Sequence, residues 1–550
     1  MARLEKIIIE GYRSIQHPVE IKFPSNMPVV LIGENNAGKS NIVRATDILF
    51  GQYYPKYKDF EDHDYYGRDP TNELEIKARV SGFEGRLGRN GEYSCLGFKL
   101  NATKGREHEF IGLQDNGQEN PYVSNDLRQE LSSIIVNAEQ NLSYQLSYAS
   151  KFTLLSKVTK SFHNRLTSDE QRVEKLKELY EEIKSTFLEV PEFADFNENM
   201  SSIAGQTITN MSYGLGLDFS AYDPSNYFKT LSVQPSHDGE IRTIDELGTG
   251  QQQILALSFA HAYSKSFLGD NLLLMIDEPE SHLHPLAQKW LARTMFEMAN
   301  DGLQVVLTTH SPHFINIEFL EGINLIRKDA EGTYSKASNA AQLVEHCVRT
   351  GVNQGRVSEE SVIPFYDNHS TAHILNGLFA NKVILVEGQT EELALPVYLK
   401  KVGLDSLQEG IEVIGVSGKG NLAKWWRFFT LYNIPTFICF DNDRTNDGDG
   451  NRRKDALKAI GIPEEELDGV LGNGDWNIND RFCVFGVDFE TTMKASFEDY
   501  DQLEREVKEE LGNSKHIVAR TVAQRLEVNE DDVGWERMRE LAENIKELTS

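Results

Sequence analysis

Short apolar runs that end in glycine or polar residues recur along this chain, and they predict the strands of two parallel sheets. In the first part of the chain such runs lie at residues 29–32, 272–276 and 305–307. Each is too short for a helix and apolar throughout, which is typical of a strand buried on both faces. The apolar residues within positions 1–10 predict one more strand.

The same pattern begins again after residue 380. Apolar runs at residues 382–386, 411–416 and 436–440 alternate with segments of helical spacing, the first of them at residues 390–401. A strand–helix–strand–helix–strand order predicts a small parallel sheet whose strand ends meet at one edge. We therefore expect an α/β protein with two such units.

The chain between the first two runs has a different character. Residues 127–145 and 168–187 show helical spacing with many charges, and the second segment carries opposite charges four positions apart. We predict a helical insertion at about residues 150–230 that helps two subunits to associate. The alternative is a helical lid without a partner.

Length and composition set the frame for these elements. The chain has 550 residues, more than one hydrophobic core usually holds, so we expect a first domain over residues 1–375 and a second over residues 376–550. No apolar run approaches the roughly 20 residues of a membrane span, and the apolar part of the N-terminus is too short for a signal peptide. We expect a cytoplasmic protein with no membrane contact.

Charge and cysteine content exclude further classes. The formal net charge of −29 argues against a broadly basic DNA-binding surface, so a nucleic-acid function must depend on a local site. The four cysteines lie far apart in the sequence and form no CxxC pair, so neither a zinc site nor a disulfide framework is indicated.

The apolar run at residues 29–32 leads directly into the sequence GENNAGKS at residues 33–40, and a helical segment follows. This is a complete phosphate-binding loop between a strand and a helix. Its backbone N–H groups surround the β-phosphate of a nucleotide, Lys39 contacts the β- and γ-phosphates, and the Ser40 hydroxyl is a Mg²⁺ ligand. The predicted ATP-binding residues of the loop are Gly33, Asn35, Asn36, Gly38, Lys39 and Ser40.

Three further polar segments complete the pattern of an ATPase. Asp277 and Glu278 end a buried strand, where the first acid is expected to hold Mg²⁺ through water and the second to polarise the attacking water. Gly248 and Gly250 open another helical run, which offers free N–H groups to an anion. His310 follows the third strand, within reach of a γ-phosphate.

These four motifs, in this order, resemble the ABC-type ATPase heads of the RecF, Rad50 and SMC proteins. In that resemblance, residues 33–40 are Walker A, residues 277–278 are Walker B, and His310 is the switch histidine. Residues 248–251 are a variant of the signature motif, with Gly-Thr-Gly where Ser-Gly-Gly is usual. Such heads bind ATP between two subunits, so the resemblance implies a homodimer.

Acidic residues also end the strands of the second predicted sheet. Glu387 ends a strand and Glu391 lies in the first turn of the next helix, so both can face one ion. Asp441 and Asp443 lie two positions apart on an extended segment and point to the same side. Crowded carboxylates raise one another's pKa, and a divalent cation relieves the repulsion. Such oxygen ligands suit Mg²⁺ or Mn²⁺.

This second set resembles a TOPRIM domain, the Rossmann-like domain shared by topoisomerases, bacterial primases and certain nucleases. An ABC-type head joined to a TOPRIM domain resembles the OLD family (overcoming lysogenisation defect), which includes the nuclease subunit of Gabija anti-phage systems. The resemblance covers nearly the whole chain. The metal ligands that it implies are Glu387, Glu391, Asp441, Asp443, Asp488 and Glu490.

The same resemblance implies the catalytic roles. Water activated by one or two metal ions attacks a DNA phosphodiester, while Lys515 stabilises developing negative charge. The sequence departs from the family at His516, where a proline commonly follows the lysine, and Arg520 is the alternative cation. The catalytic residues expected in the two sites are Glu278, His310, Glu387, Asp441 and Lys515.

The sequence thus predicts an ATP-binding, metal-dependent DNA endonuclease whose nucleotide state regulates cleavage, in anti-phage defence or DNA processing. Its partners are expected to be DNA, ATP and a second copy of the chain. A helicase encoded nearby is a further candidate partner. The main alternative is a RecF-like, DNA-binding structural ATPase with a non-cleaving TOPRIM module. A primase-like nucleotidyl transferase and a non-enzymatic ATP sensor are further alternatives.

Overall fold

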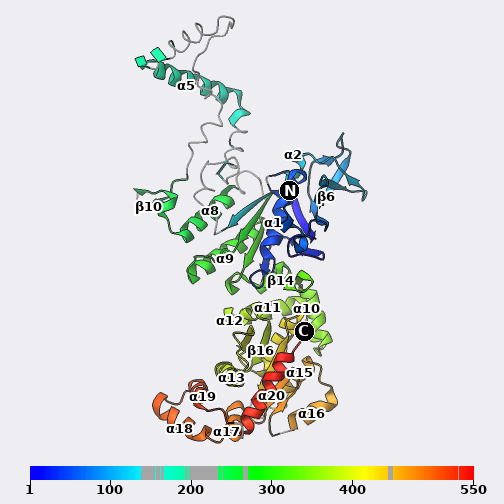
Figure 1. The fold of residues 1–550 in the computed structure, drawn as a ribbon, viewed down its shortest axis with the longest axis vertical. Helices are drawn as coiled ribbons and strands as arrows, with labels where there is room; N and C mark the ends of the chain where they lie inside the picture. Colours follow the sequence, from blue (N-terminus) through cyan, green and yellow to red (C-terminus); the bar gives the residue numbers. More distant parts are fainter. Residues whose placement is uncertain are drawn as a thin grey trace.

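The computed structural model of the protein describes most of the chain. The described residues are 1–51, 53–137, 166–192, 233–237, 240–263, 271–443, 450–472, 474–529 and 532–549, with a few positions between 155 and 198. Most of the helical insertion predicted at about residues 150–230 therefore lies outside the described residues. Within it the structure describes one long helix, α5 (Glu170–Leu188), at the upper end of Figure 1.

A six-stranded sheet lies at the centre of the first part of the chain, with the strand order β15-β14-β3-β13-β12-β9. Its strands are β3 (Val29–Ile32), β9 (Ser132–Asn137), β12 (Leu272–Asp277), β13 (Gln304–Thr309), β14 (Ile323–Asp329) and β15 (Gly332–Ala337). All neighbouring strands are parallel except β14 and β15. Ile32 pairs with Thr309, and Thr308 pairs with Asp277, so the ends of β3, β12 and β13 meet at one edge.

The two faces of this sheet are covered differently. Helix α1 (Lys39–Phe50) packs on one face, and a second, antiparallel sheet closes over it, so that the buried side of α1 shares a hydrophobic cluster with Ile7 and Met275. Helices α8 (Thr249–Tyr263) and α9 (Pro285–Asn300) cover the other face. The antiparallel strands are β1 (Arg3–Glu10), β2 (Val19–Lys22), β4 (Leu74–Ser81), β5 (Arg86–Leu87), β6 (Tyr93–Ala102), β7 (Glu109–Gln114) and β8 (Glu119–Asn120).

The C-terminal part contains a five-stranded sheet with the order β17-β16-β18-β20-β19, parallel except for β19. Its strands are β16 (Lys382–Val386), β17 (Ile411–Gly415), β18 (Thr436–Asp441), β19 (Asn477–Ile478) and β20 (Phe482–Phe485). Alternate residues of β16 point into two different hydrophobic cores. Val383 and Leu385 belong to one core, and Ile384 and Val386 belong to the other. The sheet is therefore buried on both faces, as its apolar strands predicted.

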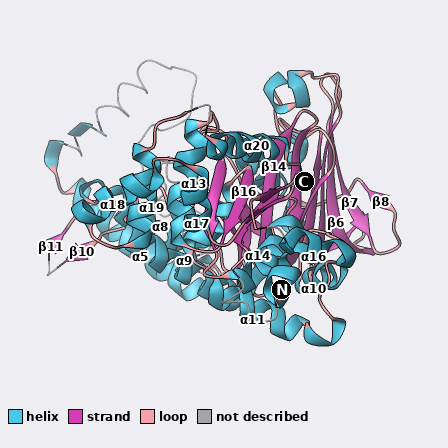
Figure 2. Cartoon of the chain, turned by 90° about the horizontal axis from the view of Figure 1, so that it is seen from below, coloured by secondary structure: helices cyan, strands magenta, loops and turns pink. Residues whose placement is uncertain are grey.

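Helices flank this sheet on both sides, as Figure 2 shows. One core contains α13 (Gln389–Lys401), α17 (Phe489–Ser496), α18 (Tyr500–Leu511), α19 (Lys515–Arg525) and α20 (Val533–Glu547). The other contains α14 (Lys419–Leu431), α15 (Asn451–Ala459) and α16 (Glu464–Gly472). The second core also includes Leu274, Leu325 and Tyr366, so one continuous hydrophobic cluster joins the two parts of the molecule.

The connection between the two sheets is helical. It consists of α10 (Ala340–Arg349), α11 (Glu359–His369) and α12 (Ala372–Leu375), which lie between the two sheets in Figure 1. The predicted domain boundary at residues 375–376 coincides with the end of α12 and stays a prediction, because the continuous core crosses it.

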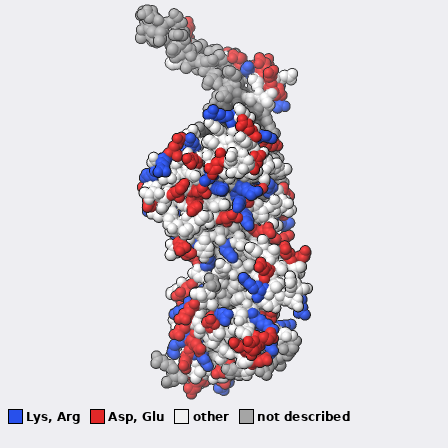
Figure 3. All heavy atoms as spheres, turned by 90° about the vertical axis from the view of Figure 1, so that its right-hand side faces the viewer, with Lys and Arg blue, Asp and Glu red and all other residues white. Residues whose placement is uncertain are grey.

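The predicted α/β fold class is confirmed by these two parallel sheets. No helix in the described part of the chain is long and apolar enough to cross a membrane. On the face shown in Figure 3, basic and acidic side chains are interspersed over both parts of the molecule.

Candidate functional site

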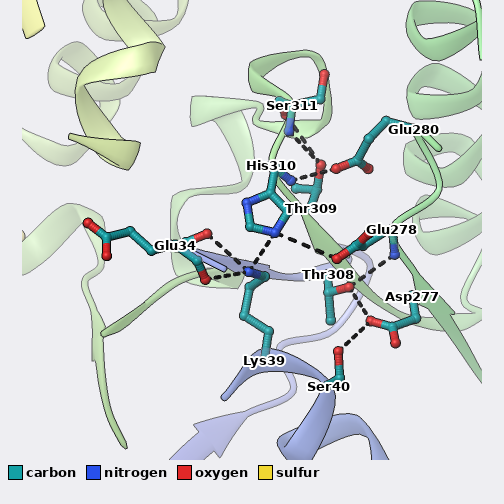
Figure 4. Close-up of polar contacts among 11 residues, drawn as sticks. Glu34, Lys39, Ser40, Asp277, Glu278, Glu280, Thr308, Thr309, His310 and Ser311 are labelled. Carbon is teal, nitrogen blue, oxygen red and sulfur yellow. Dashed lines mark hydrogen bonds and ion pairs between the residues drawn. The ribbon is translucent and has the colours of Figure 1, made fainter. Parts of the chain in front are cut away.

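The structure brings three of the four ATPase motifs together at one edge of the six-stranded sheet (Figure 4). Lys39, the first residue of α1, donates from Nζ to the backbone oxygens of Gly33 (3.0 Å) and Glu34 (2.9 Å), and Nζ lies 2.9 Å from His310 Nε2. The glycine at position 38 is required, because its φ is +110° and a Cβ there would lie 2.5 Å from Thr333 Oγ1. The loop is thus closed around the lysine ammonium group.

The acid pair at the end of β12 faces the loop. Ser40 donates from Oγ to Asp277 Oδ1 at 3.0 Å, which brings the two predicted Mg²⁺ ligands within contact. His310 Nε2 lies 3.6 Å from Glu278 Oε1. Burial lowers the pKa of both His310 and Lys39, and the neighbouring lysine lowers the pKa of His310 further. The imidazole is therefore neutral at pH 7 and can accept a hydrogen bond.

Two residues that the sequence reasoning missed hold these groups. Thr308 donates from Oγ1 to Asp277 Oδ1 at 2.5 Å and accepts from the backbone N–H of Glu278 at 3.0 Å. Glu280 accepts from the backbone N–H of His310 at 2.5 Å, and burial raises its pKa. Thr308 lies at the end of β13 and pairs with Asp277 of β12 in the sheet. This neighbourhood depends on the register of the two strands, which the sequence does not give.

The other predicted nucleotide-binding residues lie apart from this cluster. Asn35 and Asn36 are exposed residues of the loop. Gly248 is exposed just before α8 and donates from its backbone N–H to Gln251 Oε1 at 3.2 Å, while Gly250 lies against Leu283. The contacts of the two glycines are thus with their own helix and with the segment after the acid pair.

The second group of acids lies at the C-terminal edge of the five-stranded sheet. Glu387 accepts from the backbone N–H of Asp441 at 2.8 Å, which connects the ends of β16 and β18. Glu391 accepts from the backbone N–H of Gly388 at 3.1 Å, so it closes the first turn of α13. Burial raises the pKa of each of these glutamates to about 7.

Asp441 has a more strongly raised pKa than either glutamate. Burial raises its pKa to about 9, and the neighbouring charges of Glu391 and Glu387 add to the effect. Its Oδ1 atom is buried and has no hydrogen-bond partner among the described residues. An oxygen that is shielded from water and unpaired favours the approach of a cation.

The remaining predicted ligands are arranged less closely. Asp443 follows Asp441, and its backbone oxygen accepts from Lys419 Nζ at 3.4 Å. Asp488 accepts from the backbone N–H of Thr491 at 2.6 Å and so caps α17. Glu490 lies 3.6 Å from Lys515 Nζ, whose side chain is 81% exposed.

No group of three or more metal-binding side chains lies within ligand distance of a common point in the part of the chain that the structure describes. The acids nevertheless form one electrostatic group, since Glu391, Glu387 and Glu490 all raise the pKa of Asp441. Their oxygen donors, their burial and the unpaired Oδ1 atom fit the chemistry of a divalent cation.

Lys419 is a further residue of this site that the sequence reasoning did not assign. It is the first residue of α14, is 7% exposed, and its Nζ lies 3.5 Å from Glu387 Oε1. It lowers the pKa of both Glu387 and Asp441. The available signal was its place in a Ser-Gly-Lys-Gly turn after a buried strand, the same local arrangement as the phosphate loop.

The chain combines a P-loop ATPase domain with a parallel sheet that carries acidic residues at its C-terminal edge. This combination defines the class of protein. The AAA ATPase domain family model matches residues 3–187 and 114–315, which together extend over more than half of the chain. The model "Overcoming lysogenization defect protein-like, TOPRIM domain" matches residues 378–443. The chain belongs to the AAA ATPase domain family and carries an OLD-like TOPRIM domain, so the predicted OLD-family resemblance is confirmed.

Curated proteins with the same domains are similar over most of the chain. The chain is 25% identical over 471 residues to the OLD nuclease of Thermus scotoductus, covering 80% of this chain and 82% of that protein. It is 22% identical over 537 residues to the Old nuclease of Escherichia phage P2, covering 88% and 84%. A shorter match, 23% over 186 residues, is to endonuclease GajA of Bacillus cereus, covering 32% of this chain and 27% of that protein.

Proposed function

We propose that this protein is an ATP-binding, divalent-metal-dependent DNA endonuclease whose ATPase head regulates cleavage at the TOPRIM site. The observation that carries the proposal is the buried, unpaired Oδ1 atom of Asp441 among Glu387, Glu391 and Glu490. Uncompensated buried carboxylates are costly in a folded protein and are typical of functional sites. The names of the similar proteins, two OLD nucleases and an endonuclease, support the same activity.

Each acid of the TOPRIM site is positioned for ligation by the backbone. Glu387 is held by the N–H of Asp441, and Glu391 by the N–H of Gly388, so one carboxylate oxygen of each side chain is fixed. Mg²⁺ or Mn²⁺ bound by these acids would neutralise their charge and supply Lewis-acid activation for phosphodiester hydrolysis. Lys419 and Lys515 lie beside Glu387 and Glu490, where they would stabilise negative charge on a bound phosphate.

The ATPase head is arranged to bind MgATP. Ser40 and Asp277 would hold the Mg²⁺, Lys39 would exchange its bonds to loop carbonyls for phosphate oxygens, and Glu278 would polarise the attacking water. The exposure of Gly248 supports a site completed by a second subunit, and hence a homodimer. Cleavage of phage DNA or DNA processing, with or without a helicase encoded nearby, is the proposed biological setting.

Incubation of supercoiled plasmid with the purified protein tests the endonuclease proposal. We expect conversion to nicked or linear DNA with Mg²⁺ or Mn²⁺, no conversion in EDTA, and a rate that depends on ATP. Intact plasmid with both ions, with and without nucleotide, would refute the proposal. Glu387→Gln is expected to abolish cutting while circular dichroism shows the same fold.

A RecF-like structural ATPase with a non-cleaving TOPRIM module is the second candidate. It is favoured by the commitment of Asp488 to the cap of α17 and by the outward position of Lys515. The two candidates differ in one readout, since ATP hydrolysis and DNA binding without cleavage in either metal would support the second candidate.

A further inference from the structure

A cavity of about 350 Å³ lies beside the TOPRIM acids, between α17, α18 and the N-terminal end of α19. Glu490 is on its wall toward the acids, and Tyr500, which is 1% exposed, is another lining residue. The cavity thus connects the proposed cleavage site with a surface that the proposed mechanism does not use.

Lysine side chains from three helices line this cavity. They are Lys494 of α17, Lys508 of α18 and Lys515, the first residue of α19. Three acids, Asp488, Glu490 and Glu504, line the same cavity. Which ligand the cavity takes therefore depends on how these acids are already paired.

Two of the lysines share a single carboxylate. Glu504 lies 2.7 Å from Lys494 Nζ through Oε2 and 2.9 Å from Lys508 Nζ through Oε1, and its side chain is 13% exposed. Lys494 Nζ is also 3.9 Å from Asp501, which is largely exposed. Lys494, Lys508 and Glu504 together carry a formal charge of +1, and water screens the charge of the exposed Asp501, so positive charge is left for an anion.

The acids on the opposite wall are occupied in other ways. Asp488 caps α17, where the helix dipole offsets its charge, and Glu490 is a predicted metal ligand that faces Lys515. The Ser514 side chain makes no capping hydrogen bond at the start of α19, so the N-terminal N–H groups of that helix add positive potential toward the cavity.

We propose that Lys494 and Lys508 form a phosphate-binding site that holds the nucleic-acid strand next to the scissile phosphodiester. This inference rests on the proposed nuclease function. The ligand is a phosphate group, from either the strand backbone or a strand terminus. By binding a neighbouring phosphate, the lysine pair determines which phosphodiester of the DNA strand lies at the TOPRIM acids. Both lysines are therefore positioning residues.

The competing explanation is that the two ion pairs only connect α17 to α18. Glu504→Gln separates the two explanations, because it breaks both ion pairs and at the same time frees both lysines. If the lysines bind phosphate, Glu504→Gln must strengthen DNA binding while Lys494→Ala and Lys508→Ala weaken it. If the ion pairs are only structural, all three substitutions must act in the same direction.

The experiment measures binding of a short, fluorescently labelled DNA duplex by anisotropy over a range of KCl concentrations. The full-length protein carries Asp441→Asn in every sample, so that the duplex is not cut. We expect each lysine substitution to reduce the magnitude of the slope of log K against log [salt] by about 0.9, the loss of one phosphate contact. A 5′-phosphorylated duplex that binds more tightly than a hydroxyl-ended one assigns the site to a terminal phosphate, and equal binding assigns it to the backbone.

Lys458→Ala is the matched control, because Lys458 forms a similar ion pair with Glu464 on the other side of the sheet. It is expected to leave the slope unchanged. Unchanged slopes for both cavity lysines, or weaker binding by Glu504→Gln, would overturn the phosphate site. Plasmid cutting by the unsubstituted protein is measured in parallel, so that cleavage with unaltered slopes rejects only this inference, whereas no cutting rejects the nuclease itself.

Discussion

At the scale of single residues, the main cost of this fold is the burial of charged and titratable groups at strand ends. Asp441 has an unpaired buried oxygen, and Lys39 has its ammonium group enclosed by loop carbonyls. The fold satisfies Lys39 Nζ through these carbonyls but leaves Asp441 Oδ1 unpaired. In the proposed function, phosphate oxygens replace the carbonyls at Lys39 and a cation pairs with Asp441. Substitutions at such positions should reduce activity without reducing the stability of the ligand-free protein.

Asp441→Asn is predicted to abolish cleavage without lowering the melting temperature of the metal-free protein. The amide has nearly the same shape and replaces a carboxyl whose Oδ1 atom makes no hydrogen bond in the described structure. Mg²⁺ or Mn²⁺ should raise the melting temperature of the unsubstituted protein but not that of the variant, since only the former binds the ion.

Differential scanning fluorimetry with and without metal, beside a plasmid assay, checks this prediction. Asp405→Asn is the control, because Asp405 pairs with Lys400 outside the site and its loss should leave both metal stabilisation and cleavage intact. A variant that is still stabilised by metal would remove Asp441 from the ligand set.

His346 is predicted to make the protein sensitive to acid. It is 7% exposed, bonds Thr430 at 3.0 Å, and faces Arg349, Arg427 and Lys336. Burial and these cations lower its pKa to about 4. In the unfolded chain this histidine takes up a proton below about pH 6.5, whereas in the folded chain it does so only below about pH 4. The free energy of unfolding therefore falls as the pH falls from about 6.5 to about 4.

Urea denaturation near neutral pH and at about pH 5 measures the effect. His346→Gln should lose about 2 kcal/mol less stability between the two conditions than the unsubstituted protein. His17→Gln, at an exposed position, should not alter the difference. Equal losses in the His346 variant and the unsubstituted protein would show that this histidine does not govern the acid response.

At the scale of elements, the β14–β15 hairpin contacts both the phosphate loop and the segment that leads into β16. A Cβ on Gly33 of the phosphate loop would lie 2.0 Å from the backbone oxygen of Ile326, so β14 is in direct contact with the loop. Thr333 of β15 donates from Oγ1 to the backbone oxygen of Ala37 at 2.8 Å. Arg327, next to Ile326, donates to the backbone oxygen of Ala380, just before β16.

Arg327→Met is predicted to weaken the effect of ATP on cleavage while leaving ATP binding nearly unchanged. The methionine keeps the buried stem but loses the bond to Ala380, and Arg327 Nε makes no hydrogen bond in the described residues that would also be lost. Cleavage rates with and without ATP, beside nucleotide titrations, check the prediction. Arg293→Met, which removes only the exposed pair with Glu297, should retain the full ATP effect.

At the scale of the whole molecule, the proposed dimer predicts complementation between two inactive variants. Lys39→Ala removes the phosphate contact, and Gly248→Asp places a negative charge where the signature segment would meet the partner's nucleotide. If the sites are composite, a mixture should recover about one quarter of the unsubstituted ATPase rate, because half of the randomly formed dimers hold one intact site of two. Absence of any recovery after subunit exchange would favour sites contained within one subunit.

The pattern of apolar runs predicted β3, β12 and β13 of the first parallel sheet and β16, β17 and β18 of the second, because strands buried on both faces are apolar throughout and end at polar residues. It was wrong for β9, which lies within residues 127–145, a segment whose spacing predicted a helix. In the antiparallel sheet over α1 it predicted only β1, because strands such as β4 alternate buried and exposed residues. The acids at strand ends were predicted because sequence spacing alone places them on a sheet edge. Lys419, Thr308 and Glu280 were missed because their roles depend on a neighbouring strand or turn.

The sequence by itself determined the class of protein, since the phosphate loop, the acid pair and the second set of acids depend on local spacing that chemistry requires. Only the tertiary structure decided which of these groups meet and at what electrostatic cost. Burial and strand register are properties of the packed chain, and they alone set the raised pKa of Asp441, the lysine pair around Glu504 and the contact of β14 with the phosphate loop.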